Sequence, residues 1–104
     1  MIIKWQLFLD DERDPDDPVE YVICRNSSEA IKFILLNGLP TYMSLDHDLG
    51  GHDTGMVFVK GLVEYCLDRR IMFTTEWNIH SQNVEGAKNM KSMLEQLTWY
   101  TKDF

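Results

Sequence analysis

The sequence predicts an α/β domain with a mostly parallel four-stranded sheet, and three observations lead to this prediction. Short apolar segments alternate with longer amphipathic segments along the 104 residues, as in parallel strands joined by helices. The first and fourth strand segments alternate apolar and polar residues, whereas strands covered on both faces are continuously apolar. The loop between the first two strands carries no helix signal. We therefore expect the first connecting helix to be missing, three helices mainly on one face, and a partly bare opposite face.

Four strands are expected from the apolar runs and their flanking turn residues. They span residues 2–9, 20–24, 42–45 and 75–79. The acidic, proline-containing stretch between the first two has the composition of a loop. The first helix should begin at Asn26, Ser27 or Ser28 and end at Gly38, because these residue types favour helix caps.

Two further helices follow the third and fourth strands. Thr54 is a plausible N-cap for a helix that runs to about Arg70. Asn83 can cap a last helix that runs through about Leu97. The residues after it, 98–104, form an aromatic tail whose structure the pattern does not define.

Composition limits the classes of function. A length of 104 residues and 44% hydrophobic residues predict one folded domain over residues 1–104. A net charge of −7 argues against an extended nucleic-acid surface, because such surfaces cluster lysine and arginine. Cys24 and Cys66 are expected to be buried free thiols in a reducing compartment. No apolar run approaches the ~20 residues of a membrane span, and residues 1–6 do not resemble a secretion signal, so we expect a cytoplasmic protein.

Acidic residues follow the first and third strands. Asp10 and Asp11 come directly after the first strand, and Asp46 and Asp48 come after the third. The carboxyl ends of parallel strands open into one crevice, and strands about 4.8 Å apart bring their terminal carboxylates within reach of one ion. Carboxylates so placed repel one another unless a cation lies among them. Mg²⁺ or Mn²⁺ is the natural candidate, whereas Asp14, Asp16 and Asp17 are expected to be solvated.

The same loop offers a histidine and glycines. His47 could bind a softer metal such as Mn²⁺ or Zn²⁺, donate to a phosphate, or hydrogen-bond the loop backbone. Gly50 and Gly51 allow positive φ, so the loop could present N–H groups to an anion. His52 is expected to lie at the loop surface.

The segment His80–Asn83 ends the fourth strand and begins the last helix, whose amino terminus favours anions. Ser81 offers a hydroxyl, and Asn83 offers an amide or a helix cap. His80 is suited to general acid or base work near neutral pH. Helix capping explains a serine or an asparagine here as well as catalysis does, but it does not explain His80.

Three motifs in this order resemble the receiver domains of two-component signalling. They are 9–13 (LDDER), 44–50 (SLDHDLG) and 80–83 (HSQN). The closer resemblance is to the cyclic-phosphate processing receiver-like domains of bacteria and phages, and it covers nearly the whole chain. It implies a truncated receiver-like (flavodoxin-like) fold with strand order 2-1-3-4. Val84 departs from the proline that this family often has after the asparagine.

The resemblance also implies a function, namely metal-dependent processing of cyclic phosphates at RNA ends or in cyclic nucleotides. Metal ligands are expected at Asp10, Asp11, Asp46 and Asp48, and phosphate contacts at Gly50, Ser81 and Asn83. The expected catalytic residues are Asp46, His47, His80 and Ser81. Two alternatives stay open: a non-catalytic module that binds a phosphorylated ligand, and a signalling receiver with Asp46 as phosphoacceptor. The second is disfavoured because signalling receivers carry a lysine after a fifth strand, and Lys102 is the only late candidate.

The expected partner is a small phosphorylated ligand or an RNA terminal phosphate, with neither a membrane nor an extended nucleic-acid surface. The bare sheet face could be covered by the Trp99–Tyr100 tail or by a second subunit. A homodimer through that face or through the tail is therefore a further hypothesis.

Overall fold

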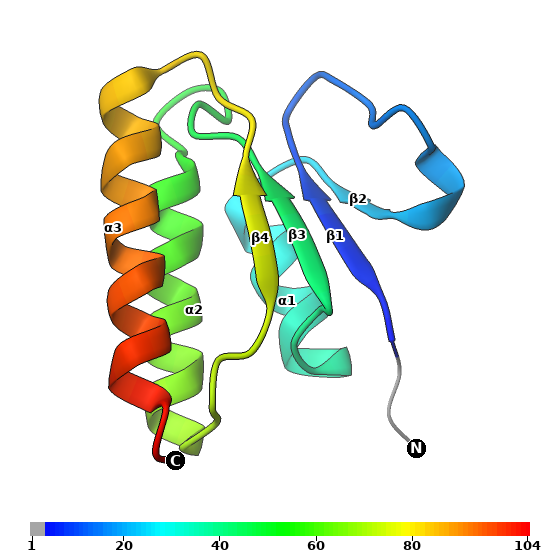
Figure 1. Cartoon of the computed structure of the whole chain (residues 1–104). Coiled ribbons are helices and arrows are strands. Elements are labelled where there is room, and N and C mark those ends of the chain that lie inside the picture. The colour runs from blue at the N-terminus through cyan, green and yellow to red at the C-terminus, as the bar shows by residue number, and fades with distance from the viewer. Residues whose placement is uncertain (1–3) are drawn as a thin grey trace.

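The computed structural model describes residues 4–104 and contains one parallel sheet (Figure 1). Its strands are β1 (Gln6–Leu9), β2 (Val22–Cys24), β3 (Tyr42–Leu45) and β4 (Glu76–Ile79). They pair in the order β2-β1-β3-β4, and every pairing is parallel. The predicted sheet and strand order are confirmed. The strand expected over 2–9 begins only at Gln6, and its first two residues lie outside the described part of the chain.

Three α-helices connect and follow the strands, and polar side chains cap all three. They are α1 (Ser27–Asn37), α2 (Gly55–Arg69) and α3 (Val84–Thr101). The caps are Asn26, Thr54 and Asn83, whose side-chain oxygens each accept a backbone N–H from the first turn. Gly38 ends α1 with a φ of 83°, which is a conformation that glycine adopts without strain. The caps predicted at these positions are confirmed.

The connection between β1 and β2 contains no α-helix, as expected, but it does contain a short 3₁₀ helix, η1 (Pro18–Glu20). Proline at the first position suits such a turn because its φ is already close to the helical value. This connection lies beside the sheet rather than crossing one of its faces (Figure 1).

The aromatic tail is helical, and α3 continues to Thr101 instead of ending near Leu97. The cause is tertiary: the Thr101 hydroxyl is buried, donates to the carbonyl of Leu97 and accepts from the backbone N–H of Phe73. Trp99 and Tyr100 are 65% and 66% exposed on this helix. They therefore do not cover the bare face of the sheet, as one of the sequence-based alternatives proposed.

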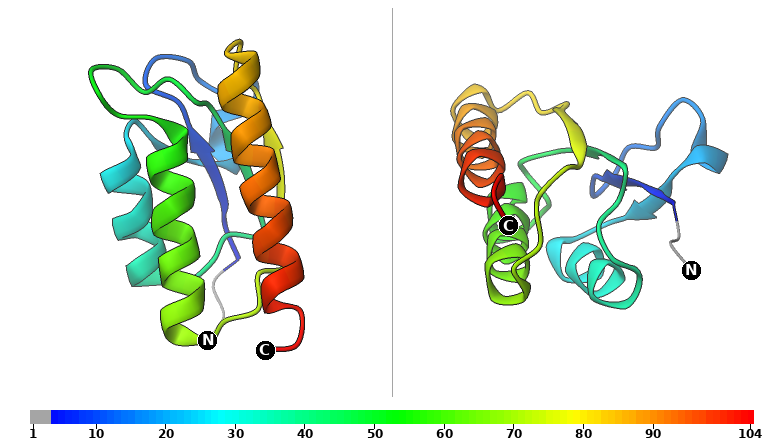
Figure 2. Two further views of the ribbon diagram at one scale, coloured as in Figure 1. Left: turned by 90° about the vertical axis from the view of Figure 1, so that its left-hand side faces the viewer. Right: turned by 60° about the horizontal axis from the view of Figure 1, so that its bottom comes forward.

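The hydrophobic core lies between the sheet and the three helices, which gather on one side of it (Figure 2). Alternate strand residues that point to the helices are completely buried: Leu7, Leu9, Met43 and Leu45. The opposite face carries residues such as Gln6, Tyr42 and Glu76, which are half-buried or exposed. The expectation of one covered face and one partly bare face is confirmed.

Two further predictions concern the thiols and the membrane. Cys24 and Cys66 are free and buried, and burial raises the pKa of each thiol to about 11. In the described part of the chain, no helix combines the length and the apolar character needed to cross a bilayer.

Candidate functional site

The register of the sheet aligns three chemically active residues at its carboxyl edge. Leu9 pairs with Leu45, and Leu45 pairs with Ile79. The next residue of each strand is therefore also aligned, and these residues are Asp10, Asp46 and His80. Backbone hydrogen bonds extend the ladder there, from Asp46 to the carbonyl of Leu9 and from His80 to the carbonyl of Leu45.

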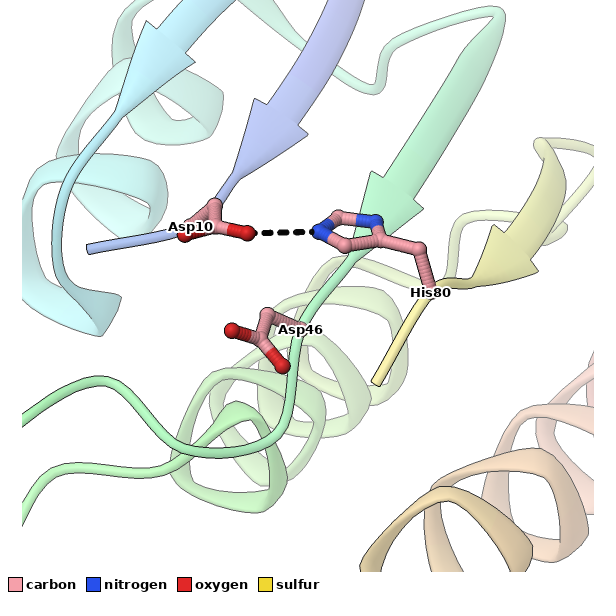
Figure 3. Close-up of side chains that lie close together, drawn as sticks. All are labelled: Asp10, Asp46 and His80. Carbon is pink, nitrogen blue, oxygen red and sulfur yellow. Dashed lines mark hydrogen bonds and ion pairs between the residues drawn. The ribbon is translucent and has the colours of Figure 1, made fainter. Parts of the chain in front are cut away.

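The side chains of Asp10, Asp46 and His80 converge (Figure 3). One ligand atom from each lies within 4.8 Å of those from the other two. Because side chains alternate along a strand, all three belong to the series of residues that points to the bare face. The site thus lies at the junction of that face and the edge of the sheet.

Asp10 is buried and fully hydrogen-bonded. Its Oδ1 accepts the backbone N–H groups of Glu12 and Arg13, and its Oδ2 lies 3.0 Å from both Arg13 Nε and His80 Nε2. Burial alone would raise the pKa of this carboxyl, but the two backbone donors, His80 and the Arg13 charge together lower it below its ordinary value. Asp10 is therefore a stable anion at neutral pH.

His80 is held on three sides. Its Nε2 contacts Asp10, its Nδ1 lies 2.7 Å from the Ser44 hydroxyl, and its ring stacks on Phe8 with centroids 4.7 Å apart. A serine hydroxyl can both donate and accept, so Ser44 can pair with either tautomer of the imidazole. These contacts orient the ring so that Nε2 points at the carboxylates.

Arg13 supplies a positive charge between the two carboxylates. Its Nε pairs with Asp10, its Nη2 lies 3.6 Å from Asp46 Oδ2, and the same Nη2 donates to the carbonyl of His80. Arg25 fixes the loop from behind by donating to the carbonyls of Asp10 and Arg13 and by pairing with Asp14. The repulsion expected between the acids is therefore offset in part by a side chain of the same loop.

A cavity of about 470 Å³ opens beside this cluster. Besides Asp10 and Asp46, its wall carries four residues expected from the sequence: Asp11, Asp48, Gly50 and Ser81. Gly50 has a φ of 85°, and a Cβ there would lie 3.3 Å from the Asp11 carboxylate, so glycine suits this wall both for its backbone and for its size. The structure thus brings all four predicted metal ligands to one cavity, together with two of the three predicted phosphate contacts, Gly50 and Ser81. Asn83 does not line this cavity, and its contact with phosphate stays a prediction.

His47 and Asn83 connect the loop after β3 to the start of α3. His47 Nδ1 lies 2.8 Å from Asp48 Oδ1, and the Asn83 amide nitrogen lies 3.3 Å from each of these atoms. The hydrogen bonds from His47 and Asn83 lower the pKa of the Asp48 carboxyl. The His47 ring packs so closely on Gly86 that a side chain there would overlap it. These residues join the loop after β3 to the start of α3, and catalysis by His47 stays a prediction.

Ser81 and Asn83 shape the start of α3. The Asn83 N–H donates to the Ser81 hydroxyl, and the Asn83 side-chain oxygen accepts from the N–H of Gly86. Asn83 therefore caps the helix, while Ser81 both supports this turn and lines the cavity.

Comparison with known proteins agrees with this geometry. The sequence model of the family described as the cyclic-phosphate processing receiver domain matches residues 5–96. The chain belongs to this family. Neither the curated proteins nor the solved structures include a significant match.

This cyclic-phosphate processing receiver domain has a donor set that suits a divalent metal. Two carboxylates and one imidazole offer hard oxygen and borderline nitrogen ligands, which fit Mn²⁺ and, through the carboxylates, Mg²⁺. The compact cluster contains His80 where the sequence led us to expect Asp11 and Asp48. Those two carboxylates line the neighbouring cavity.

Three residues of the site were missed in the sequence. Arg13, Ser44 and Phe8 contact the carboxylates or His80 but were given no role there. Arg13 is a cation within an acidic run, and Ser44 is a hydroxyl within an apolar strand. Each is a local inconsistency, and such inconsistencies often mark functional sites.

Proposed function

We propose that this domain is a phosphoesterase that uses a divalent metal to hydrolyse cyclic phosphates of nucleotides or RNA ends. The observation that carries the proposal is the convergence of Asp10, Asp46 and His80 at the edge of a cavity wide enough for a small phosphate ester. The family description supplies the cyclic-phosphate chemistry.

Asp10 and Asp46 would hold the metal, Mg²⁺ or Mn²⁺, with Asp11 and Asp48 contributing from the cavity wall. When bound, such a metal supplies positive charge to the phosphoryl oxygens and lowers the pKa of a bound water. Ser81 offers a hydroxyl to the phosphate, and Gly50 lets the loop backbone approach it closely. The amino terminus of α3 adds a favourable dipole for an anion.

His80 is the proposed proton carrier. Ser44 and Phe8 orient its ring. When both ring nitrogens are protonated, Nδ1 can donate to Ser44 and Nε2 to Asp10, and Nε2 can then give its proton to the leaving oxygen. Asp46 is the second candidate in the reaction, as a nucleophile, because its carboxylate lines the cavity. Its attack on phosphorus would break the bond to one ring oxygen of the cyclic phosphate, and that oxygen would leave as a hydroxyl. The free thiols Cys24 and Cys66 suit a cytoplasmic location for this activity.

The test is turnover of a nucleoside 2′,3′-cyclic phosphate in Mg²⁺ or Mn²⁺. Asp46→Asn should lower the rate at least about hundredfold, because it removes a ligand or nucleophile. Asp68→Asn is the matched control, since Asp68 is exposed on α2 far from the edge of the sheet, and it should leave the rate unchanged. Undiminished turnover by Asp46→Asn would contradict the proposal.

Two further outcomes select the alternatives. Binding of the nucleotide without product over hours, lost in Asp46→Asn, would identify a non-catalytic binding module. Formation of an acyl phosphate on Asp46 with acetyl phosphate would identify a phosphoaccepting receiver.

A further inference from the structure

A second cavity, of about 430 Å³, opens on the bare face of the sheet beside the carboxylate cavity. Its wall carries the rings of Phe8, Tyr21 and His80 and the hydroxyl of Ser44. Arg13 lines both cavities. His80 links them as well, since one ring nitrogen faces Asp10 and the other faces Ser44. A ligand with two chemically different parts can therefore occupy both.

The wall of the second cavity belongs to a continuous row of rings. His80 stacks on Phe8. The rings of Tyr21 and Phe8 meet edge to face with centroids 5.8 Å apart, and the centroids of the Tyr42 and Tyr21 rings lie 6.4 Å apart. Phe8 is only 8% exposed, whereas Tyr21 is half-buried and lines the cavity. Flat heteroaromatic bases stack on rings presented by an open sheet face.

The rim of the second cavity is acidic. Asp14, Asp16 and Asp17 line it, and of these Asp14 pairs with Arg25. Carboxylates repel phosphates, so the charged part of a ligand is disfavoured here. Carboxylates do accept hydrogen bonds from the amino groups of adenine, guanine and cytosine. The chemistry of this cavity thus fits a neutral nucleoside with an amino-bearing base.

We propose that the second cavity is a nucleoside subsite and that the substrate class is a mononucleoside cyclic phosphate rather than an RNA end. This inference rests on the proposed function. The phosphate lies in the carboxylate cavity, the base lies against Tyr21, and Arg13 lies between them. The remaining phosphates of an RNA chain would meet Asp16 and Asp17.

The first test compares two probes with the same cyclic phosphate chemistry. Adenosine 2′,3′-cyclic phosphate carries a base, and glycerol 1,2-cyclic phosphate does not. By calorimetry, Tyr21→Ala should weaken binding of the adenosine compound about five- to hundredfold, which is the usual effect of losing one stacking ring. Binding of the glycerol compound should not change.

Two variants serve as controls for this test. Tyr21→Phe keeps the ring and should bind both probes as the wild type does. Tyr100→Ala removes an exposed ring on α3 and should change neither affinity. Equal weakening of both probes by Tyr21→Ala, unchanged binding of the adenosine compound, or no binding of it to the wild type would overturn the subsite.

The second test separates the subsite from the proposed reaction. With excess EDTA present, adenosine should give a saturation-transfer difference NMR signal with the wild-type protein. The signal should be absent with the Tyr21→Ala protein. This signal needs neither metal nor turnover. An adenosine signal without turnover of the cyclic phosphate would support the subsite and contradict the proposed phosphoesterase. Turnover without the adenosine signal would support the phosphoesterase and contradict the subsite.

The third test decides between a mononucleotide and RNA. A short oligoribonucleotide that ends in a 2′,3′-cyclic phosphate should bind more weakly than the mononucleotide. Added salt should reduce this difference in affinity, because it screens the repulsion between the acidic rim and the phosphates of the oligoribonucleotide. Oligonucleotide binding that equals or exceeds that of the mononucleotide would overturn the proposed substrate class.

Discussion

Gly55 is the residue at which the site and the core are most tightly joined. It begins α2, its N–H donates to the carbonyl of His47, and it lies against the backbone of Asp46 and the side chain of Met90. A Cβ here would overlap the Asp46 carbonyl oxygen and would come within 2.6 Å of the Met90 methyl carbon. The space that a side chain needs is thus filled by the backbone of a proposed metal ligand.

We expect Gly55→Ala to destabilise the protein by about 3 kcal/mol, because the new methyl group clashes with the Asp46 backbone, which cannot move away as a flexible side chain would. Urea unfolding measures this change. Gly61→Ala is the matched control within α2: its Cβ would meet mainly the flexible end of Ile31, and the helix gains a better helix former. If Gly55→Ala lowers the free energy of unfolding no more than Gly61→Ala does, the loop that carries Asp46 can shift to make room, and the prediction is wrong.

Some residues of the site could be read directly from the sequence. Asp10, Asp46 and His80 each follow an apolar strand, and this local signal identified all three. Arg13 could not be assigned in this way, because its role depends on contact with Asp46 and with the carbonyl of His80. Those partners are distant in sequence, and only strand pairing places them beside the loop.

Among the elements, α2 depends on a cap that also closes the loop after β3. Thr54 accepts the N–H of Val57 and forms an isolated bridge with Asp48. The cap therefore anchors the first turn of α2 and the carboxylate-bearing loop at the same point.

Thr54→Ala should cost about 1 kcal/mol of stability, because the N–H of Val57 loses its side-chain acceptor, and Thr54→Ser should restore most of it. Both changes can be followed by urea unfolding. Thr98→Ala, at an exposed position within α3, should be neutral or slightly stabilising, since alanine favours a helix interior. A Thr54→Ala protein as stable as the wild type would mean that water replaces the cap.

The elements themselves were largely predictable, because strand periodicity and helix caps depend on residues only a few positions apart. The end of α3 was not. Its last turn is stabilised by the contact of Thr101 with Phe73, and no local pattern encodes a contact of that sequence separation.

At the scale of the whole molecule, the two partner surfaces expected from the sequence were the bare face and the aromatic end of α3. On the bare face, Gln6, Glu76 and Asn78 are polar, and the rings of Phe8, Tyr21 and His80 line the second cavity. Trp99 and Tyr100 instead form an adjacent exposed pair on α3, with ring centroids 6.4 Å apart. Of the two dimer surfaces considered, we therefore propose the aromatic end of α3.

Sedimentation velocity at micromolar concentration should then detect a dimer. Replacing both Trp99 and Tyr100 by serine should return the protein to a monomer, because burial of two aromatic rings is the main gain. Leu36→Ser is the control, since Leu36 is 83% exposed on α1. A wild-type protein that sediments as a monomer would contradict the proposed dimer.

The sequence by itself determined the parallel α/β class, the caps of the three helices, and the acids and histidine at the strand ends. All of these depend on near neighbours along the chain or on the preference of a single residue type. Only the tertiary structure decided that His80 pairs with Asp10, that Ser44 orients it, and that Arg13 lies between the carboxylates. The physical reason is the register of β1, β3 and β4, which brings residues as far apart as 10 and 80 together.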